Sequence, residues 1–196
     1  MNSRVDKLID FLKEIDQLKY IARRIGLPKK DRWENDAEHS WHLAMFVILF
    51  EKEFPKINIA KALKLALTHD LVEIYAGDTY TFDYEAKKGK KKREFQAAKK
   101  LFGELPIDQK KEFMGLYREY EERRTKESKL VNSFDKIQPI IQNIIVEGKN
   151  WKRQKVTIED VDNLKRKYME HDKQMIKIYL RLMKEVKEKK LTYEKN

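Results

Sequence analysis

The chain has 196 residues, a formal net charge of +11 at pH 7 and no cysteine. This length is sufficient for one domain with a substantial core, and the absence of cysteine excludes both a disulfide framework and a zinc site made of thiolates. Only six glycines and four prolines occur among many Lys, Glu and Leu residues, which favours helices over sheets. We therefore expect an all-α helical bundle that forms a single domain over residues 1–196, and the cysteine-free composition indicates a cytoplasmic protein.

The charge and the apolar runs restrict the partners that the chain can have. The N-terminal residues contain early acidic side chains and no long apolar run, so they do not resemble a signal peptide. The longest apolar run, around residues 43–50, is too short to span a bilayer. The densest basic block, Lys87 to Arg93, lacks interleaved aromatic residues on which bases could stack, and we interpret it as a solvated, mobile loop that is not the primary ligand site. These features argue against a membrane or a nucleic acid as the partner.

The first segment has the features of a helix that begins at Ser3. The serine can cap free backbone amides, an apolar stripe follows, and Pro28 predicts that the helix stops near Gly26. Arg23 and Arg24 then fall in the last turn, where cations favour the negative end of the helix dipole. The functional alternative is that one of the two reaches a substrate phosphate.

The next helix should carry a histidine in its first turn. Asn35 and Glu38 have the spacing of a reciprocal cap, which places His39 in that turn. Residues 41–50 are apolar nearly all round, as is typical of a central, buried helix. His39 and His42 lie one turn apart and either could bind a metal, although an isolated histidine is more often hydrogen-bonded and structural.

Two ionisable residues, His69 and Asp70, interrupt the apolar stripe of a helix expected over residues 59–76. Burying a carboxylate beside an imidazole is costly unless each has a partner. A divalent first-row cation supplies that partner, because imidazole nitrogen and carboxylate oxygen are both suitable ligands. Glu73 follows one turn after His69, and Asp78 lies on the loop just beyond the helix. This stretch predicts a metal site with acid/base groups at its rim.

The rest of the chain predicts four further helices, over about residues 91–102, 106–124, from 125 or 128 to about 144 with a kink at Pro139, and 157–190. Asp135 lies within the helix that begins at 125 or 128. That helix is apolar, so the carboxylate again needs a partner. A second His-Asp pair, His171 and Asp172, has charged neighbours on both sides, and we interpret it as part of a solvated helix face.

The order of these residues, His39, then His69-Asp70, then Asp135, resembles the H…HD…D ligand pattern of the HD-domain phosphohydrolases. Three longer segments carry the resemblance: ENDAEHSWHLA, HDLVEIYAGDTY and FDKIQPIIQN. They are similar to the branch that contains bacterial 5′-deoxynucleotidases and their uncharacterised HD-family relatives. The three segments connect residues 35–143 to that family, and the flanking helices fit it in number and order.

The resemblance implies a cofactor and a set of site residues. It implies one divalent cation (Mn, Co, Ni, Zn, Fe or Mg), with four ligands: His39, His69, Asp70 and Asp135. In the deoxynucleotidases, the glutamate and the aspartate that follow the HD pair assist catalysis, and the matching positions here are Glu73 and Asp78.

The resemblance also implies a phosphate-binding arginine. In that family an arginine near the end of the first helix contacts phosphate, and its spacing to the first motif points to Arg24. The tryptophan that follows this arginine in the characterised enzymes is Ile25 here, so the nucleotide preference is left open. His42 does not occupy a ligand position, and we expect it to be structural or to support a ligand.

The implied reaction is hydrolysis of (deoxy)nucleoside 5′-monophosphates to nucleoside and phosphate. The cation would polarise a phosphoryl oxygen, Glu73 or Asp78 would transfer a proton, and Arg24 would bind phosphoryl oxygens. One alternative is an HD-type hydrolase of another phosphorylated substrate, such as a nucleoside triphosphate or a signalling nucleotide. A second is a non-enzymatic basic helical protein that binds nucleic acid and uses the metal structurally, but such a site would not need Glu73 and Asp78. The expected partner is therefore a small phosphorylated molecule. The sequence leaves open whether the protein forms a homodimer.

Overall fold

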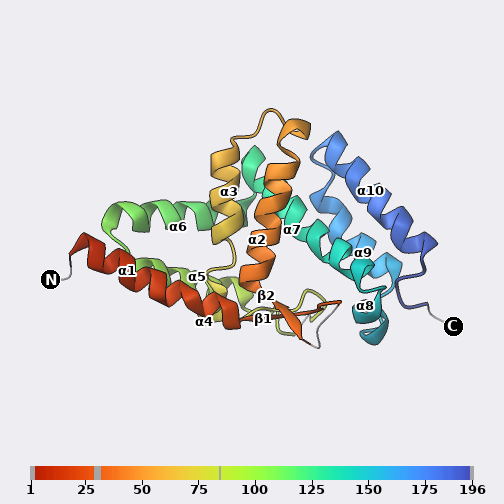
Figure 1. Ribbon diagram of the computed structural model, residues 1–196, viewed down its shortest axis with the longest axis horizontal. Helices are drawn as coiled ribbons and strands as arrows, with labels where there is room; N and C mark the ends of the chain where they lie inside the picture. Colours follow the sequence, from red (N-terminus) through yellow and green to blue (C-terminus); the bar gives the residue numbers. More distant parts are fainter. Residues whose placement is uncertain (1–2, 29–31, 84, 195–196) are drawn as a thin grey trace.

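The computed structural model describes residues 3–28, 32–83 and 85–194, and helices make up most of them (Figure 1). The α-helices are α1 (Arg4–Ile15), α2 (Asp36–Leu49), α3 (Ile59–Thr68), α4 (Glu73–Ala76), α5 (Lys90–Gly103), α6 (Ile107–Glu122), α7 (Lys126–Ile145), α8 (Lys149–Arg153), α9 (Ile158–Lys165) and α10 (Lys173–Glu188). The 3-10 helices are η1 (Asp16–Tyr20), η2 (Glu51–Glu53) and η3 (Arg166–Tyr168). The predicted all-α fold is confirmed, apart from two short antiparallel strands, β1 (Ala22–Gly26) and β2 (Trp33–Asn35).

Helix α7 is the centre of the larger hydrophobic core. It packs against α2, α3, α6 and α10, and its Phe134, Ile137 and Ile140 are fully buried. Leu43 of α2 and Leu65 of α3 meet this surface and are fully buried too. In Figure 1, α2 and α3 stand side by side in front of α7, with α1 at one end of the long axis and α10 at the other. This packing fixes the relative positions of the helices that carry the histidines and Asp135.

A second, smaller apolar cluster lies between α1, α5 and α6. Phe11, Leu101 and Phe102 are buried in it, and Phe113 packs edge-on against Phe11 at 5.7 Å. Leu71 and Val72, which follow the HD pair directly, are buried in the same cluster. The turn that carries His69 and Asp70 is therefore held by the larger core on one side and by this cluster on the other.

Among the described residues, no helix is both long and apolar enough to cross a membrane.

The N-terminal helix ends earlier than predicted. It starts with the expected cap at Ser3, whose side chain accepts from the Asp6 amide, but it ends at Ile15 and continues as η1. Residues 22–26 are extended because they pair with Trp33–Asn35 in the two-stranded sheet. The prediction that Arg23 and Arg24 occupy a last helical turn is wrong. Successive side chains of a strand point to opposite faces, so the two arginines point in different directions.

The helix predicted over residues 59–76 is interrupted at His69. Helix α3 ends at Thr68, a turn carries His69 and Asp70, and α4 begins at Glu73. The turn is closed by the Glu73 amide, which donates to the Asp70 carbonyl at 2.9 Å, and by the His69 ring, whose Nδ1 lies 2.9 Å from the Ala66 carbonyl. These local bonds replace the helical ladder and bring the His69 and Asp70 side chains together.

The prediction of a single C-terminal helix over residues 157–190 is also wrong. Thr157 caps α9 as expected, but η3 and a turn separate α9 from α10. His171 and Asp172 lie in that turn and not on a solvated helix face. A His171 ring nitrogen lies 2.8 Å from Ser133 Oγ, and Asp172 caps α10 by accepting from two backbone amides.

The sharp turn after α7 requires a glycine. Gly148 has a φ of 71°, and a Cβ at this position would lie 1.9 Å from the Leu191 carbonyl oxygen. The turn leads directly into α8, which places Asn150 and Trp151 against the end of α7 and against β1.

Candidate metal centre and active site

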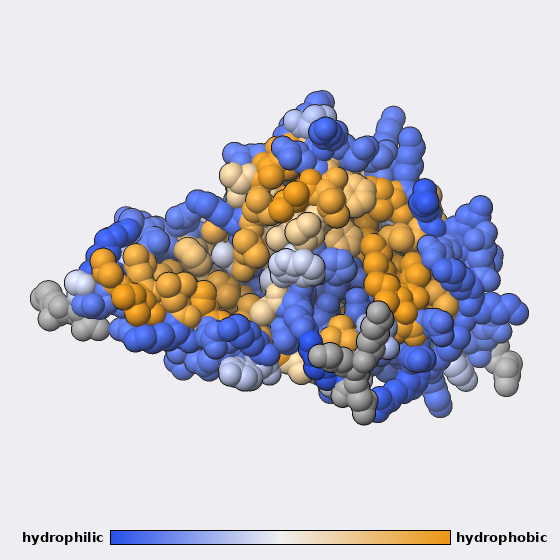
Figure 2. Space-filling view, in the orientation of Figure 1, coloured by the Kyte–Doolittle hydropathy of each residue, from blue (hydrophilic) through white to orange (hydrophobic). Residues whose placement is uncertain are grey.

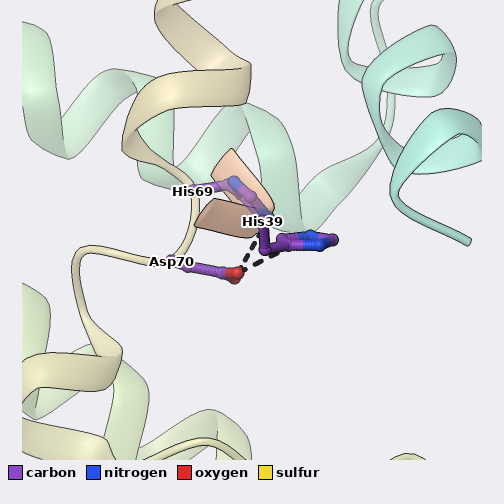
Figure 3. A group of neighbouring side chains, drawn as sticks. All are labelled: His39, His69 and Asp70. Carbon is purple, nitrogen blue, oxygen red and sulfur yellow. Dashed lines mark ion pairs between the residues drawn. The ribbon is translucent and has the colours of Figure 1, made fainter. Parts of the chain in front are cut away.

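His39, His69 and Asp70 converge, although they come from different elements (Figure 3). His39 is in the first turn of α2, and the HD pair is in the turn after α3. Each of the three offers a ligand atom, and these atoms all lie within 4.8 Å of one another. The Asp70 Oδ2 is 3.1 Å from His69 Nε2 and 3.8 Å from His39 Nε2. All three residues are buried.

The fourth expected ligand, Asp135, approaches the same group from α7. Its Oδ1 lies 3.1 Å from His39 Nε2, while its Oδ2 accepts from Tyr120 Oη at 2.7 Å and from Lys136 Nζ at 2.6 Å. Burial alone would raise the pKa of Asp135, but the Lys136 ammonium and the His39 ring outweigh it and hold that pKa well below its ordinary value. Asp135 is therefore an anion beside the histidines.

The hydrogen bonds of the His69 ring test whether these residues fit a cation. The Ala66 carbonyl can only accept, so Nδ1 carries a proton and donates to it. In the neutral ring Nε2 then has a lone pair, which faces the Asp70 carboxylate at 3.1 Å. Two acceptors at this distance need a positive charge between them, either a proton or a metal ion. Two imidazoles with two carboxylates are a donor set that suits a divalent first-row cation, so the residues fit such an ion.

The pKa directions agree with a cationic centre. Burial lowers the pKa of His69, but Asp70 outweighs this effect and the pKa is raised above its ordinary value. In His39, burial and then the Arg23 charge lower the pKa to about 4, so this ring is neutral at pH 7. A neutral imidazole is the form that binds a metal.

A second group of carboxylates adjoins the histidines. Asp36, Asp70 and Glu73 each place an oxygen within 4.8 Å of the others, and all three residues are buried. Burial, followed by the charge of Asp70, raises the pKa of Asp36 to about 7, and the same two causes raise that of Glu73 well above its ordinary value. Burial also raises the pKa of Asp78, which lines one pocket together with His69, Asp70 and Glu73. Asp36 can therefore hold a proton near neutral pH, and burial favours the protonated form of Glu73 and Asp78 as well.

Arg23 is the cation that offsets this negative charge. Its Nη1 lies 2.8 Å from Asp70 Oδ2 and 3.0 Å from Asp36 Oδ1, and its Nε is 3.7 Å from Glu34 Oε2. Arg24, the arginine expected to bind phosphate, points the other way and lies over the Tyr80 ring at 5.8 Å. It lines a neighbouring pocket that also contains Asp78. The alternation along β1 therefore directs Arg23, and not Arg24, toward the HD pair.

The two arginines should differ sharply in their contribution to stability. Arg23→Met leaves several buried carboxylates without their cation and should lower the free energy of unfolding by about 3 to 5 kcal/mol. Arg24→Met removes an exposed charge and should cost less than about 1 kcal/mol. Urea denaturation of both variants under identical metal conditions measures the difference. Equal losses would mean that Arg23 does not balance the buried carboxylates.

Several residues near the site were not anticipated from the sequence. Asp36 was hidden in the capping sequence of α2, and Tyr120 and Lys136 are recognisable only through their contact with Asp135. The ring of His42 lies 3.3 Å from the Gln138 amide nitrogen, which fits the structural role expected for it.

The basic block was expected to be a solvated, mobile loop that is not the primary ligand site, and the loop part of this prediction is wrong for its second half. Lys90 to Arg93 form the first turn of α5. The Lys90 Nζ lies 3.1 Å from Glu94 Oε1 and 3.9 Å from Glu73 Oε1, and Lys90 and Lys91 line the pocket that contains His69. One end of the basic block therefore contributes positive charge to the site.

Comparison with known proteins identifies relatives that match most of the chain. Residues 15–177 match a family model described as an HD domain. Human 5′-deoxynucleotidase HDDC2 is 31% identical over 136 residues, which cover 69% of this chain and 66% of that protein. The Xenopus laevis protein of the same name is 32% identical, with coverages of 69% and 67%. The matches thus span about two thirds of the length of these relatives.

Solved structures show the same relationship. A protein described as a predicted metal-dependent phosphohydrolase from Magnetospirillum magnetotacticum MS-1 is 36% identical, with a TM-score of 0.89 and coverages of 98% of this chain and 97% of that one. An HD-domain phosphohydrolase from Listeria innocua is 20% identical with a TM-score of 0.60, covers 93% of this chain and 99% of its own, and shares the fold. Since the family model matches most of the sequence, the chain belongs to the HD-domain family.

Proposed function

We propose that the protein is a metal-dependent phosphohydrolase that releases inorganic phosphate from (deoxy)nucleoside 5′-monophosphates. The observation that carries this proposal is the His69 Nε2 directed at the Asp70 carboxylate, with His39 and Asp135 beside them. The names of the relatives, 5′-deoxynucleotidase HDDC2, support the choice of substrate. The cysteine-free composition supports a cytoplasmic location.

In this proposal His39, His69, Asp70 and Asp135 bind one divalent cation. Mn, Co, Ni, Zn, Fe and Mg are all candidates for the ion. Such an ion supplies Lewis-acid chemistry by polarising a phosphoryl oxygen. The four side chains would hold the ion from three separate elements, and the Tyr120 and Lys136 bonds to Asp135 hold that carboxylate in place.

The residues at the rim of the site move protons and bind charge. Glu73 and Asp78 line the pocket, and the Glu73 Oε2 is buried without a hydrogen-bond partner among the described residues. Either carboxyl group can accept a proton from the attacking water or return one to the leaving oxygen. Arg23 can donate charge-assisted hydrogen bonds to the phosphoryl oxygens from inside the pocket, and Arg24 can do so from the neighbouring one.

A metal-by-substrate screen tests this proposal. Protein stripped of metal is reloaded with each candidate cation and incubated with deoxynucleoside and ribonucleoside monophosphates, nucleoside triphosphates and a non-nucleotide phosphomonoester. We expect release of inorganic phosphate from the monophosphates. Release of pyrophosphate or triphosphate would instead assign a different HD-type reaction. Salt-dependent binding of nucleic acid without any hydrolysis would favour the non-enzymatic alternative.

We also propose that the protein forms a homodimer through the exposed apolar face of α1. Val5, Ile9 and Leu12 lie one helical turn apart and are 46–64% exposed. Figure 2 shows a continuous hydrophobic surface over α1. An apolar stripe of this kind on a surface helix is typical of an interface, and a C2 dimer would pair it with its own copy.

Charge placed on this face should separate the subunits. Ile9→Glu is expected to convert a dimer to a monomer in sedimentation equilibrium. Leu180→Glu provides the control, because Leu180 is similarly exposed, at 45%, but lies on α10 at the opposite end of the molecule. A wild-type monomer, or a dimer that survives Ile9→Glu, would exclude this interface.

A further inference from the structure

A second pocket adjoins the one that contains the histidines. The two pockets share Arg23, Asp78, Thr79 and Thr81 in their walls. The other residues that line the second pocket include Arg24, Tyr80, Asn143, Asn150, Trp151 and Lys165. A substrate whose phosphate lies beside His69 and Asp70 can therefore extend into this second pocket.

The side chain of Asn150 is held so that a donor remains free. Its Oδ1 accepts from the Gly26 amide of β1 at 3.2 Å, which fixes the orientation of the side-chain amide. The Nδ2 is buried and has no hydrogen-bond partner in the part of the chain that the structure describes. The approach is close, because a Cβ on Gly26 would lie 3.3 Å from this Oδ1.

Asn143 shows the opposite arrangement and leaves an acceptor free. Its Nδ2 donates to the Pro139 carbonyl at 2.8 Å, which again fixes the amide orientation. Its Oδ1 is buried without a partner within the described ranges. Asn143 and Asn150 are 2% and 9% exposed, so both unpaired atoms lack full access to water. Buried polar atoms without a partner are costly, and a ligand that pairs with both would remove that cost.

A buried lysine adds a second donor to the same pocket. Lys165 is 3% exposed, and its Nζ donates to the Lys136 carbonyl at 2.8 Å. Among the described residues it has no carboxylate in ion-pair contact. Burial and the Lys136 charge lower the pKa of Lys165 to about 7, and both the amine and the ammonium keep a further N–H for a ligand oxygen or ring nitrogen.

We propose that this second pocket binds the nucleobase of the substrate through Asn143, Asn150 and Lys165. The inference rests on the proposed function, because it takes the phosphate to lie beside the HD pair. Asn143 Oδ1 accepts from a base N–H, and Asn150 Nδ2 and Lys165 Nζ donate to a base carbonyl or ring nitrogen. Nucleobases carry such donors and acceptors on adjacent atoms of one edge, which a sugar phosphate or a simple phosphomonoester lacks. These residues thus position the substrate and do not take part in the chemistry.

The test compares a substrate with and without the base. The kcat/KM for a deoxynucleoside 5′-monophosphate is divided by that for 2-deoxyribose 5-phosphate, in the wild type and in Asn150→Asp. The aspartate can still accept from the Gly26 amide but replaces the free donor with an acceptor. We expect this ratio to fall by about tenfold or more, as for loss of one buried hydrogen bond. Asn163→Asp makes the same change at an exposed position of α9 and should leave the ratio unchanged.

A second variant covers the case in which Asn150→Asp does not fold. Lys165→Met removes the ammonium without touching the Gly26 contact, and it should lower the same ratio. The inference is overturned if folded Asn150→Asp or Lys165→Met keeps the wild-type ratio, or if the wild type does not prefer the nucleotide. If neither phosphate ester is hydrolysed with any cation, the proposed function fails; if both are hydrolysed with an unchanged ratio, only the inference fails.

Discussion

Replacing His69 with alanine is expected to abolish phosphate release and to remove the bound metal. His69 contributes the Nε2 that faces the Asp70 carboxylate, so the variant loses one ligand and leaves that carboxylate without its neighbour. Loss of the cation removes several kcal/mol of transition-state stabilisation, which corresponds to a decrease in kcat/KM of roughly a thousandfold or more. Metal analysis of the purified variant and a phosphate-release assay measure the two effects together.

The second His-Asp pair supplies a matched control for this experiment. His171→Ala also removes a histidine that precedes an aspartate, but the His171 ring contacts Ser133 and is not part of the group formed by His39, His69 and Asp70. We expect this variant to keep its metal and its activity. Added cation should also raise the melting temperature of the wild type and of His171→Ala, because it binds to the folded state. At a hundredfold excess of cation over Kd, this binding adds about 2.7 kcal/mol to the free energy of unfolding. Full metal content in His69→Ala would rule out the proposed ligand set.

The starts of the helices could be predicted from the sequence because the signal is local. The caps at Ser3, Asn35 and Thr157 each use a side chain and a backbone amide within three residues, and all three are present in the structure. Helix interruptions were harder to predict. The turn at His69 depends on its ring bonding the Ala66 carbonyl, and the apolar spacing across the turn still resembles that of one continuous helix.

The candidate site shows the same division between local and distant causes. The family pattern correctly indicated residues that the fold brings together, namely His39, His69 and Asp70. Its spacing pointed to Arg24 as the phosphate-binding arginine, whereas Arg23 is the one that faces them. Helical spacing made Arg23 and Arg24 equivalent neighbours at a helix end, whereas pairing with Trp33–Asn35 makes the segment extended and turns Arg23 inward. A contact between segments that are distant in the sequence decided the outcome, and no local pattern contains that information.

Glu73 lies where two roles for a carboxylate diverge. It begins α4, and its Oε1 is 3.9 Å from Lys90 Nζ while its Oε2 lacks a hydrogen-bond partner among the described residues. In one role Glu73 supports the ligands and tunes the metal, as carboxylates beside a metal site often do. In the other it transfers a proton to or from the attacking water or the leaving group. Glu73 lines the pocket with Asp78, and burial followed by the charge of Asp70 raises its pKa well above the ordinary value, which favours the second role.

Glu73→Gln separates the two roles, because glutamine keeps the shape and the hydrogen-bonding reach but cannot titrate. If Glu73 transfers protons, the variant should keep its metal and bind substrate while kcat falls by roughly two to four orders of magnitude. If Glu73 only supports the ligands, metal binding should weaken by about ten- to a hundredfold and excess metal should restore activity. Glu94→Gln is the matched control, since Glu94 is also buried and also contacts Lys90, at 3.1 Å. We expect the large loss of kcat in Glu73→Gln alone, and full recovery with added metal would show that Glu73 acts through the ligands.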